Sequence, residues 1–175
     1  MRYDSEERFP LVDETGHTIG SATRSECHDG TKRLHPVVHL HVVSPAGAIL
    51  LQKRSMNKDI QPGKWDTAVG GHVDFGEEIR EALMREAQEE LGIDASDARP
   101  LATYVFESDV EREYVSTFCL IADPETLQLT AAEDEVDDTR FWSIDEIEEN
   151  FGQGVMTPNF EMEYRRILPA LKKQL

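Results

Sequence analysis

The stretch AVGGHVDFGEEIREALMREAQEELGI (residues 68–93) decides how this chain can fold. After a pair of glycines, its apolar residues recur at the four-residue spacing of a helix face: Ile79, Leu83, Ala87 and Leu91. Gly92 then provides a stop, because helices commonly end at a glycine. The pattern predicts a helix that follows Gly76, runs to about Leu91 and packs its apolar face on a sheet.

Acidic residues crowd the end of this helix. Glu86 and Glu90 lie one turn apart on one side, and Glu89 lies roughly 60° away on the flank. Like charges at this spacing repel one another, and the negative end of the helix dipole adds a further penalty. A hard divalent cation with oxygen ligands would offset both penalties. A solvated, Glu-rich helix face is the alternative explanation for these three residues alone.

Composition bounds the class of protein. The 175 residues are 39% hydrophobic and 30% charged, as in a globular protein, and one domain is expected over residues 1–175. A net charge of −17 argues against a nucleic-acid partner. There is no apolar run of membrane-spanning length and no secretory signal, so we expect a cytoplasmic protein in which Cys27 and Cys119 are reduced. The acidic run at 133–138 has no regular spacing and is expected to be a loop.

Strand signals along the rest of the chain predict an α/β fold of the mixed, α+β kind, with helices packed on a mixed sheet. An N-terminal hairpin extension is expected at about residues 9–27. The alternating run VVHLHVV (37–43) predicts a strand with apolar residues on one face and His39 and His41 on the other. Further strands are expected at 48–54, 104–107, 114–122 and 139–143.

Two more helices are predicted by their caps. Ser143 and Glu146 have the spacing of a capping box that opens a short helix. Thr157 provides an N-cap before Pro158, which opens a C-terminal helix. Four aromatic residues are expected in the core rather than in a platform that stacks on a base: Phe106, Phe141, Trp142 and Phe160.

The longer pattern carries a resemblance to a known family. Gly71, Glu77 and the run REAQEELGI (85–93) occupy nine specified positions over 23 residues, and on these the chain resembles the Nudix hydrolases. The resemblance implies an α/β/α sandwich with a mixed central sheet and a loop–helix–loop motif that holds Mg²⁺ (or Mn²⁺) against a diphosphate. It also implies that Gly70 and Gly71 let the backbone turn sharply and come close to metal and phosphate.

The same resemblance implies roles for the charged residues of the motif. The metal ligands or water activators would be three glutamates: Glu86, Glu89 and Glu90. The catalytic base would be Glu89 or Glu90, and the order of residues does not distinguish them. Glu77 and Arg85 would brace the loop against the helix rather than touch the substrate.

A second set of residues resembles one branch of this superfamily. The segments LVDETGHTIGSATRSECHDGTKRLHP (11–36) and AILLQKRSMNKDIQPGKWDTAVGGH (48–72) are similar to the type I isopentenyl-diphosphate isomerases. That branch carries a second divalent-metal site of three histidines and two glutamates. The residues that match it here are His28, His35, His72, Glu111 and Glu113. Taken singly, each has an ordinary alternative as a surface, core or strand-edge residue.

The basic residues of this region also have counterparts in that branch. It binds its diphosphate through residues just before the tryptophan turn, where Arg54 and Lys58 stand here. An ordinary charged loop is the alternative. His39 and His41 match nothing in the second metal site and are expected to be strand residues.

The chemistry implied by the resemblance favours hydrolysis. The isomerases transfer protons with a cysteine and a glutamate, and Gly70 stands at the position of that cysteine, whereas Glu113 matches the glutamate. We therefore expect an Mg²⁺-dependent hydrolase of a phosphoanhydride bond in a small organic or nucleoside diphosphate-type substrate. The alternatives are an isopentenyl-diphosphate isomerase-like enzyme and a non-catalytic diphosphate-binding module. Neither the substrate nor the oligomeric state is specified by the sequence.

Overall fold

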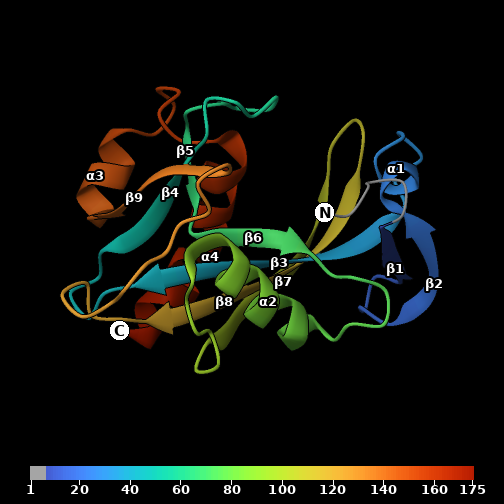
Figure 1. The fold of residues 1–175 in the computed structure, drawn as a ribbon, viewed down its shortest axis with the longest axis horizontal. Coiled ribbons are helices and arrows are strands. Elements are labelled where there is room, and N and C mark those ends of the chain that lie inside the picture. Colours follow the sequence, from blue (N-terminus) through green and yellow to red (C-terminus); the bar gives the residue numbers. More distant parts are fainter. Residues whose placement is uncertain (1–6) are drawn as a thin grey trace.

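A computed structural model describes residues 7–175 of the chain. Its main sheet consists of β3 (Leu34–Val43), β4 (Ile49–Arg54), β5 (Trp65–Thr67), β6 (Val69–His72), β7 (Arg99–Glu107), β8 (Arg112–Ile121) and β9 (Val136–Trp142). The order is β5-β4-β3-β8-β7, with β6 also pairing with β3 and β9 with β4 (Figure 1). β3 and β8 run parallel and the other neighbours run antiparallel, so the sheet is mixed.

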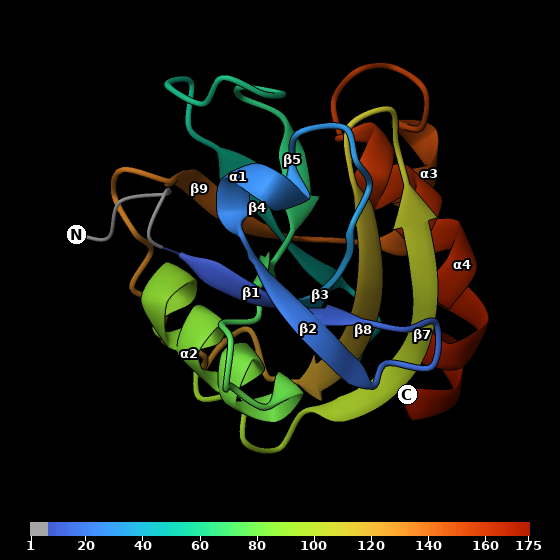
Figure 2. The same cartoon turned by 90° about the vertical axis from the view of Figure 1, so that its right-hand side faces the viewer.

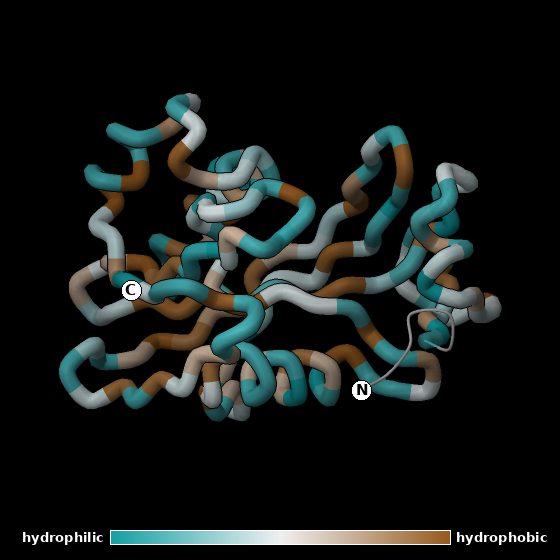
Figure 3. The backbone as a smooth tube through the Cα atoms, turned by 45° about the horizontal axis from the view of Figure 1, so that its top comes forward, coloured by the Kyte–Doolittle hydropathy of each residue, from teal (hydrophilic) through white to brown (hydrophobic). Residues whose placement is uncertain are grey.

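Helices cover both faces of this sheet. Figure 2 shows α2 (Ile79–Leu91) on one side of the strands and α3 (Ile144–Glu149) and α4 (Pro158–Gln174) on the other. Apolar stretches recur along the central strands (Figure 3). One core packs the inner face of α2 on the sheet, and a second core packs α3 and α4 on the opposite face. The expected class, a mixed sheet sandwiched between helices, is confirmed.

A smaller unit lies beside one end of β3. β1 (Arg8–Val12) and β2 (Thr18–Thr23) form a separate antiparallel hairpin, and the single turn α1 (Arg24–Cys27) follows it (Figure 1). Thr23 and Glu26 close a capping box on α1, which the sequence analysis did not predict. His28 directly follows α1 as its C-cap residue, so this unit brings that histidine towards the sheet.

Both faces of β3 are buried, and its alternation sorts residues between the two layers. Val38, Leu40 and Val42 join the core under α2, as expected for one face. His39 and His41 point the other way, towards α4, where both contact Glu163. The predicted alternation is confirmed, although the histidine face meets a helix rather than solvent.

The predicted helix caps are also confirmed. α2 ends at Leu91, with Gly92 in the left-handed region at φ 65°, where a glycine is least strained. Ser143 closes a capping box on α3, and the hydroxyl of Thr157 accepts a hydrogen bond from the N–H of Phe160 at the start of α4. Among residues 7–175, no helix combines the length and apolarity that membrane crossing requires.

Three expectations need correction. The run 133–138 is a loop only at its start, since β9 begins at Val136, whose side chain fills the core under α2. Gly70 and Gly71 do not form a turn but lie in β6, paired with β3. Phe106 is only half-buried because it lies on β7 at the sheet edge, whereas the other three aromatics pack against the two cores.

The core under α2 should be sensitive to truncation. Leu83 is completely buried, so Leu83→Ala should lower the free energy of unfolding by about 2–5 kcal/mol through lost burial and a residual cavity. Gln88→Ala, at an exposed position of the same helix, should change it by less than about 0.5 kcal/mol. Urea denaturation of both variants tests this, and equal effects would contradict the assigned packing.

Candidate active site

One cavity of about 700 Å³ brings most of the predicted site residues together. It lies where β6, the end of α2 and β8 meet the segment that follows β4. Its walls include Arg54, Lys58, Gly70, Gly71, His72, Glu86, Glu89, Glu90, Glu111 and Glu113. His28 and His35 are not among the lining residues, but Nε2 of His28 lies 2.9 Å from the carboxylate of Glu111, which does line the cavity.

The closest approach of backbone and helix is at Gly71. A Cβ atom placed on this residue would lie 2.2 Å from Cδ of Glu86, so the end of that side chain would have to move. Glycine therefore provides space for the Glu86 carboxylate here and not a turn conformation. The glycine allows the end of α2 to present Glu86 directly against β6.

Arg85 ties the loop, the helix and β6 to one another. Its Nε donates to Glu77 at 2.9 Å, and its Nη2 donates to Glu77 and to the backbone carbonyl of His72, both at 3.0 Å. Its Nη1 donates to Glu86 at 2.7 Å. This bidentate pair with Glu77 confirms the predicted bracing role, because it fixes the loop that precedes α2.

The three candidate glutamates occupy different environments. Glu90 is 8% exposed and accepts hydrogen bonds from Gln52 at 3.1 Å and from the N–H of Gly70 at 3.2 Å. Burial raises the pKa of Glu90 to about 8 and also raises the pKa of Glu86. The side chain of Glu89 is 60% exposed and lies 3.5 Å from Arg85. Among residues 7–175, the carboxylate oxygens of these three glutamates do not all lie within 4.8 Å of one another, as the atoms of a preformed metal site would.

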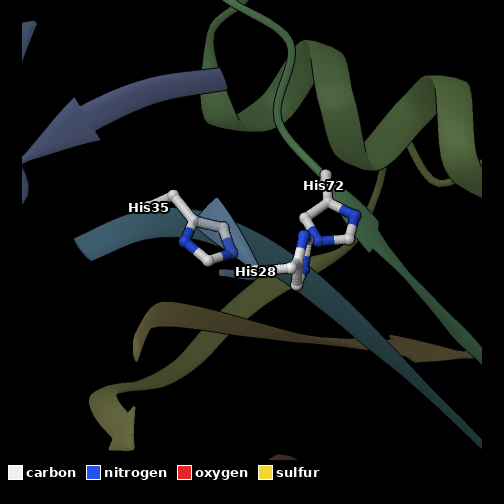
Figure 4. A group of neighbouring side chains, drawn as sticks. All are labelled: His28, His35 and His72. Atoms are coloured by element: carbon white, nitrogen blue, oxygen red, sulfur yellow. The ribbon is translucent and has the colours of Figure 1, made fainter. Parts of the chain in front are cut away.

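The histidine cluster is a gathered set of ligand atoms. Figure 4 shows the rings of His28, His35 and His72 meeting from three separate segments, the end of α1, β3 and β6. Their ligand atoms lie within 4.8 Å of one another, and the same holds for a second group of His35, Glu111 and Glu113. The Nδ1 atoms of His28 and His35 contact the backbone carbonyls of Arg24 and Arg33 at 2.7 and 2.9 Å, which leaves each Nε2 for the cluster.

The polar atoms of this cluster fit a cation. Nε2 of His35 and Nε2 of His72 are buried without a hydrogen-bond partner among the described residues, which is costly unless another group satisfies them. Burial lowers the pKa of both histidines, so each is held in the neutral form that binds metals. Burial, aided by the neighbouring charge of Glu111, raises the pKa of Glu113 to about 7. Phe9 stacks on His72, with ring centroids 4.5 Å apart, and orients that ring.

A buried charged group of the smaller chamber next to this cavity was not predicted from the sequence. Glu163 of α4 is 1% exposed and contacts both His39 and His41. The signal was present, because Glu163 stands between Phe160 and Tyr164 on the apolar face of a helix, where an unpaired carboxylate is rare. His39 also lines the cavity, which strand periodicity alone did not indicate.

Comparisons with known proteins agree with this geometry. The model of the NUDIX domain family matches residues 33–169, and the chain therefore belongs to the Nudix family. It is 34% identical over 122 residues to an isopentenyl-diphosphate Delta-isomerase of Mycolicibacterium vanbaalenii, covering 66% of this chain and 67% of that protein. It is 36% identical over 129 residues to an uncharacterized Nudix hydrolase of Listeria innocua, covering 73% and 74%.

Solved structures show the same fold. A crystal structure from Deinococcus radiodurans superposes with a TM-score of 0.77 at 23% identity, covering 92% of this chain and 99% of that one. The NUDIX domain of Shewanella oneidensis NrtR, solved with ADP ribose, superposes with a TM-score of 0.62 at 14% identity, covering 82% and 89%. At these identities the similarity concerns the fold alone.

Adding a methyl group at Gly71 should disturb the site without unfolding the protein. In Gly71→Ala the new Cβ meets the flexible end of Glu86, so the carboxylate must move away from β6. We expect Mg²⁺ affinity, measured by titration calorimetry, to fall roughly 10–100-fold with little change in melting temperature. Gly20→Ala is the matched control, because nothing lies within 4 Å of its Cβ position. Unchanged Mg²⁺ affinity in Gly71→Ala would contradict a metal site at Glu86.

The buried carboxyl of Glu90 should make stability depend on pH. Burial raises the pKa of Glu90 from its ordinary value of 4.5 to about 8 in the folded protein, so between these two values only the folded state holds the proton. The contribution of Glu90 to the free energy of unfolding should therefore decrease as the pH rises from about 5 to about 8. Mg²⁺ needs the ionised form, so the rise in melting temperature that it produces should be larger at about pH 8 than at about pH 6.

Melting curves of the wild type and Glu90→Gln, with and without Mg²⁺, measure this effect. The glutamine variant cannot titrate at this position and should lose that part of the pH dependence. An identical pH profile in both proteins would show that Glu90 is ionised throughout.

Proposed function

We propose that this chain is an Mg²⁺-dependent (or Mn²⁺-dependent) hydrolase that cleaves a phosphoanhydride bond in a small organic or nucleoside diphosphate-type substrate. The observation that carries the proposal is the shared cavity. Carboxylates of α2, the backbone of Gly70 and Gly71 and the cations Arg54 and Lys58 all line it. Its walls thus combine oxygen ligands for a hard cation with positive groups for phosphate.

Each group has a distinct task in this proposal. Glu86, Glu89 and Glu90 would hold the Mg²⁺ or activate the water, and the ion would neutralise phosphate oxygens and lower the pKa of the attacking water. Lys58 and Arg54 bind the phosphates, and Arg54 is oriented by the carbonyl of Ile60, to which its Nη2 donates at 2.9 Å.

The catalytic base is proposed to be Glu89 or Glu90, the two glutamates between which the sequence does not distinguish. Of the two, Glu90 is the better candidate, since it is buried and held beside Gly70 and Gln52, whereas Glu89 is mostly exposed. The water oxygen attacks phosphorus, the bridging P–O bond breaks, and the proton of the water passes to this carboxylate.

The histidine cluster is proposed as a second divalent-metal site. His28, His35, His72, Glu111 and Glu113 would hold the ion through imidazole nitrogens and carboxylate oxygens. Three of these residues also line the main cavity, namely His72, Glu111 and Glu113. An ion held there would add positive charge to the wall that faces the substrate.

An isomerase is the second candidate, and relatives that bear this name support it. Against it stands position 70, where the resembled isomerases carry a cysteine and this chain has no side chain. Its two cysteines are free and buried in other parts of the molecule. Cys27 lies in the small core of the hairpin, and Cys119 lies in the core under α4. Neither lines the cavity, so a proton relay through a thiol is not available there.

A substrate panel with matched variants tests the proposal. Hydrolysis of nucleoside diphosphates, nucleotide sugars, dinucleotides and prenyl diphosphates, measured by chromatography of the phosphate or phosphomonoester products, should require Mg²⁺ or Mn²⁺. Glu86→Gln and Glu90→Gln should each reduce kcat by about 100-fold or more, whereas Gln88→Ala on the exposed face of α2 should retain it.

The same panel separates the alternatives. Incorporation of deuterium from D₂O into isopentenyl diphosphate would identify an isomerase, and we expect none. Binding of a diphosphate with Mg²⁺ but without any product would identify a binding module. Retained turnover in Glu86→Gln would contradict the metal site.

A further inference from the structure

Behind Gly70, the cavity ends on a buried carboxylate that three side chains share. Glu163 accepts contacts from Nδ1 of His39 at 2.7 Å and from Nε2 of His41 at 2.6 Å, and the hydroxyl of Tyr104 donates to it as well. These residues come from α4, β3 and β7. Burial opposes ionisation of Glu163, but the two histidines outweigh burial and hold its pKa well below the usual range. The carboxylate is therefore a fixed negative charge between sheet and helix.

The two histidines that contact Glu163 differ in what surrounds the opposite edge of their rings. The side chain of His41 is 1% exposed and closed inside the core, whereas that of His39 is 24% exposed and lines the cavity. A Cβ atom on Gly70 would lie 3.2 Å from Cδ2 and 3.6 Å from Nε2 of His39, so this ring edge faces β6. Within residues 7–175, no group hydrogen-bonds the Nε2 of His39.

The surroundings keep a proton on this imidazole. Burial alone would lower the pKa of His39, but the facing carboxylate of Glu163, with smaller contributions from Glu113 on β8 and Asp66 on β5, raises the pKa to about 9. With Nδ1 turned to Glu163, the Nε2–H is a charged donor directed towards the cavity.

The chamber next to His39 is small and polar. It has a volume of about 190 Å³, and the cations Arg54 and Lys58 line it together with Gln52, Thr67 and Asn159. Four acidic residues line it as well: Asp66, Glu90, Glu135 and Glu163. Burial raises the pKa of Asp66 and Glu90, and Glu163 is paired with His39 and His41. Phe160 is the one apolar side chain among its walls in the described part of the chain, and it is 1% exposed. The cations Arg54, Lys58 and His39 can pair with phosphate oxygens there, and the chamber offers almost no surface to a hydrocarbon chain.

We propose that His39 is a substrate-binding residue whose Nε2–H donates a charged hydrogen bond to a phosphate oxygen of the diphosphate, with Glu163 as its positioning residue. The inference deepens the proposed function and rests on it. It places a phosphate in the chamber between Gly70, Arg54 and His39. A prenyl group or other apolar part of a substrate is excluded from this end of the cavity.

This role also explains why position 70 carries no side chain. At 3.2 Å from Cδ2, any Cβ would press on the imidazole, and the ring would have to shift by a few tenths of an ångström from its place beside the chamber. The residues at 39 and 70 are neighbours across the β3–β6 ladder, so a change at one is felt directly by the other. A cysteine at position 70 would crowd the same ring edge.

A matched pair of variants tests the binding role. His39→Gln and His41→Gln both remove an imidazole contact to Glu163, but only His39 reaches the cavity. The probe is inorganic diphosphate with Mg²⁺, and its affinity is measured by titration calorimetry on variants whose folding is verified by circular dichroism. We expect His39→Gln to weaken binding about 10–100-fold and His41→Gln to stay within about threefold of the wild type. Equal losses in the two variants, or no loss in His39→Gln, would overturn the proposal.

The coupling to position 70 gives a second measurement. Gly70→Ala should weaken diphosphate binding in the wild-type background and add little in the His39→Gln background, because the displaced group is then already gone. Fully additive losses would show that the methyl group acts elsewhere and would overturn the steric link.

Failure of this inference and of the proposed function are distinguishable. If the wild type binds diphosphate but hydrolyses no substrate, the hydrolase is refuted, while the comparison of His39→Gln with His41→Gln still decides the role of His39. If the wild type and the His39→Gln variant hydrolyse a diphosphate equally fast, only the role of His39 is refuted. A wild type without any affinity for diphosphate refutes both.

Discussion

The close approach of β6 to the end of α2 is the constraint on which the rest of the site depends. Gly71 leaves room for Glu86, and Arg85 holds the approach by joining Glu77, Glu86 and the carbonyl of His72. The hydrogen bonds to Glu77 and Glu86 raise the pKa of Arg85 further, so the guanidinium is a permanent cation among carboxylates. One side chain thereby fixes the distance between the glutamates of the helix and the histidine of the strand. Losing either the glycine or the arginine would separate the two candidate metal sites.

β3 connects these sites to the interior. Because side chains alternate along a strand, His35, His39 and His41 share one face, while Val38, Leu40 and Val42 build the core under α2. His35 belongs to the His/Glu cluster, and His39 reaches the polar chamber behind Gly70. The same strand therefore carries one residue of the His/Glu cluster at one end, a cavity-lining histidine in the middle and apolar packing on its reverse face. In the proposed function, this arrangement would let a strongly acidic chain present positive groups to an anionic substrate.

Much of the site was predictable because it follows from local spacing. The bounds of α2, its stop at Gly92 and the caps of α3 and α4 agree with the helical pattern and the capping rules. The bracing pair of Glu77 and Arg85 was expected and is present. The turn expected at Gly70 and Gly71 was wrong, since the composition of a segment does not show whether a glycine serves conformation or space. The start of β9 was missed because acidic residues there face solvent while Val136 faces the core.

The sequence by itself determined the helices α2, α3 and α4, the alternation of β3, the membership of the Nudix family and the identity of the charged residues. Only the tertiary structure decided which charges face one another. The contact between His39 and Glu163 joins residues 124 positions apart, and neither residue carries a local signal of the other. Spacing rules act over one or two turns of chain, whereas the pairing of buried charges is set by how sheet and helices pack and by the high cost of leaving a charge unpaired in the interior. The environment of each glutamate, and hence its pKa, depends on that packing in the same way.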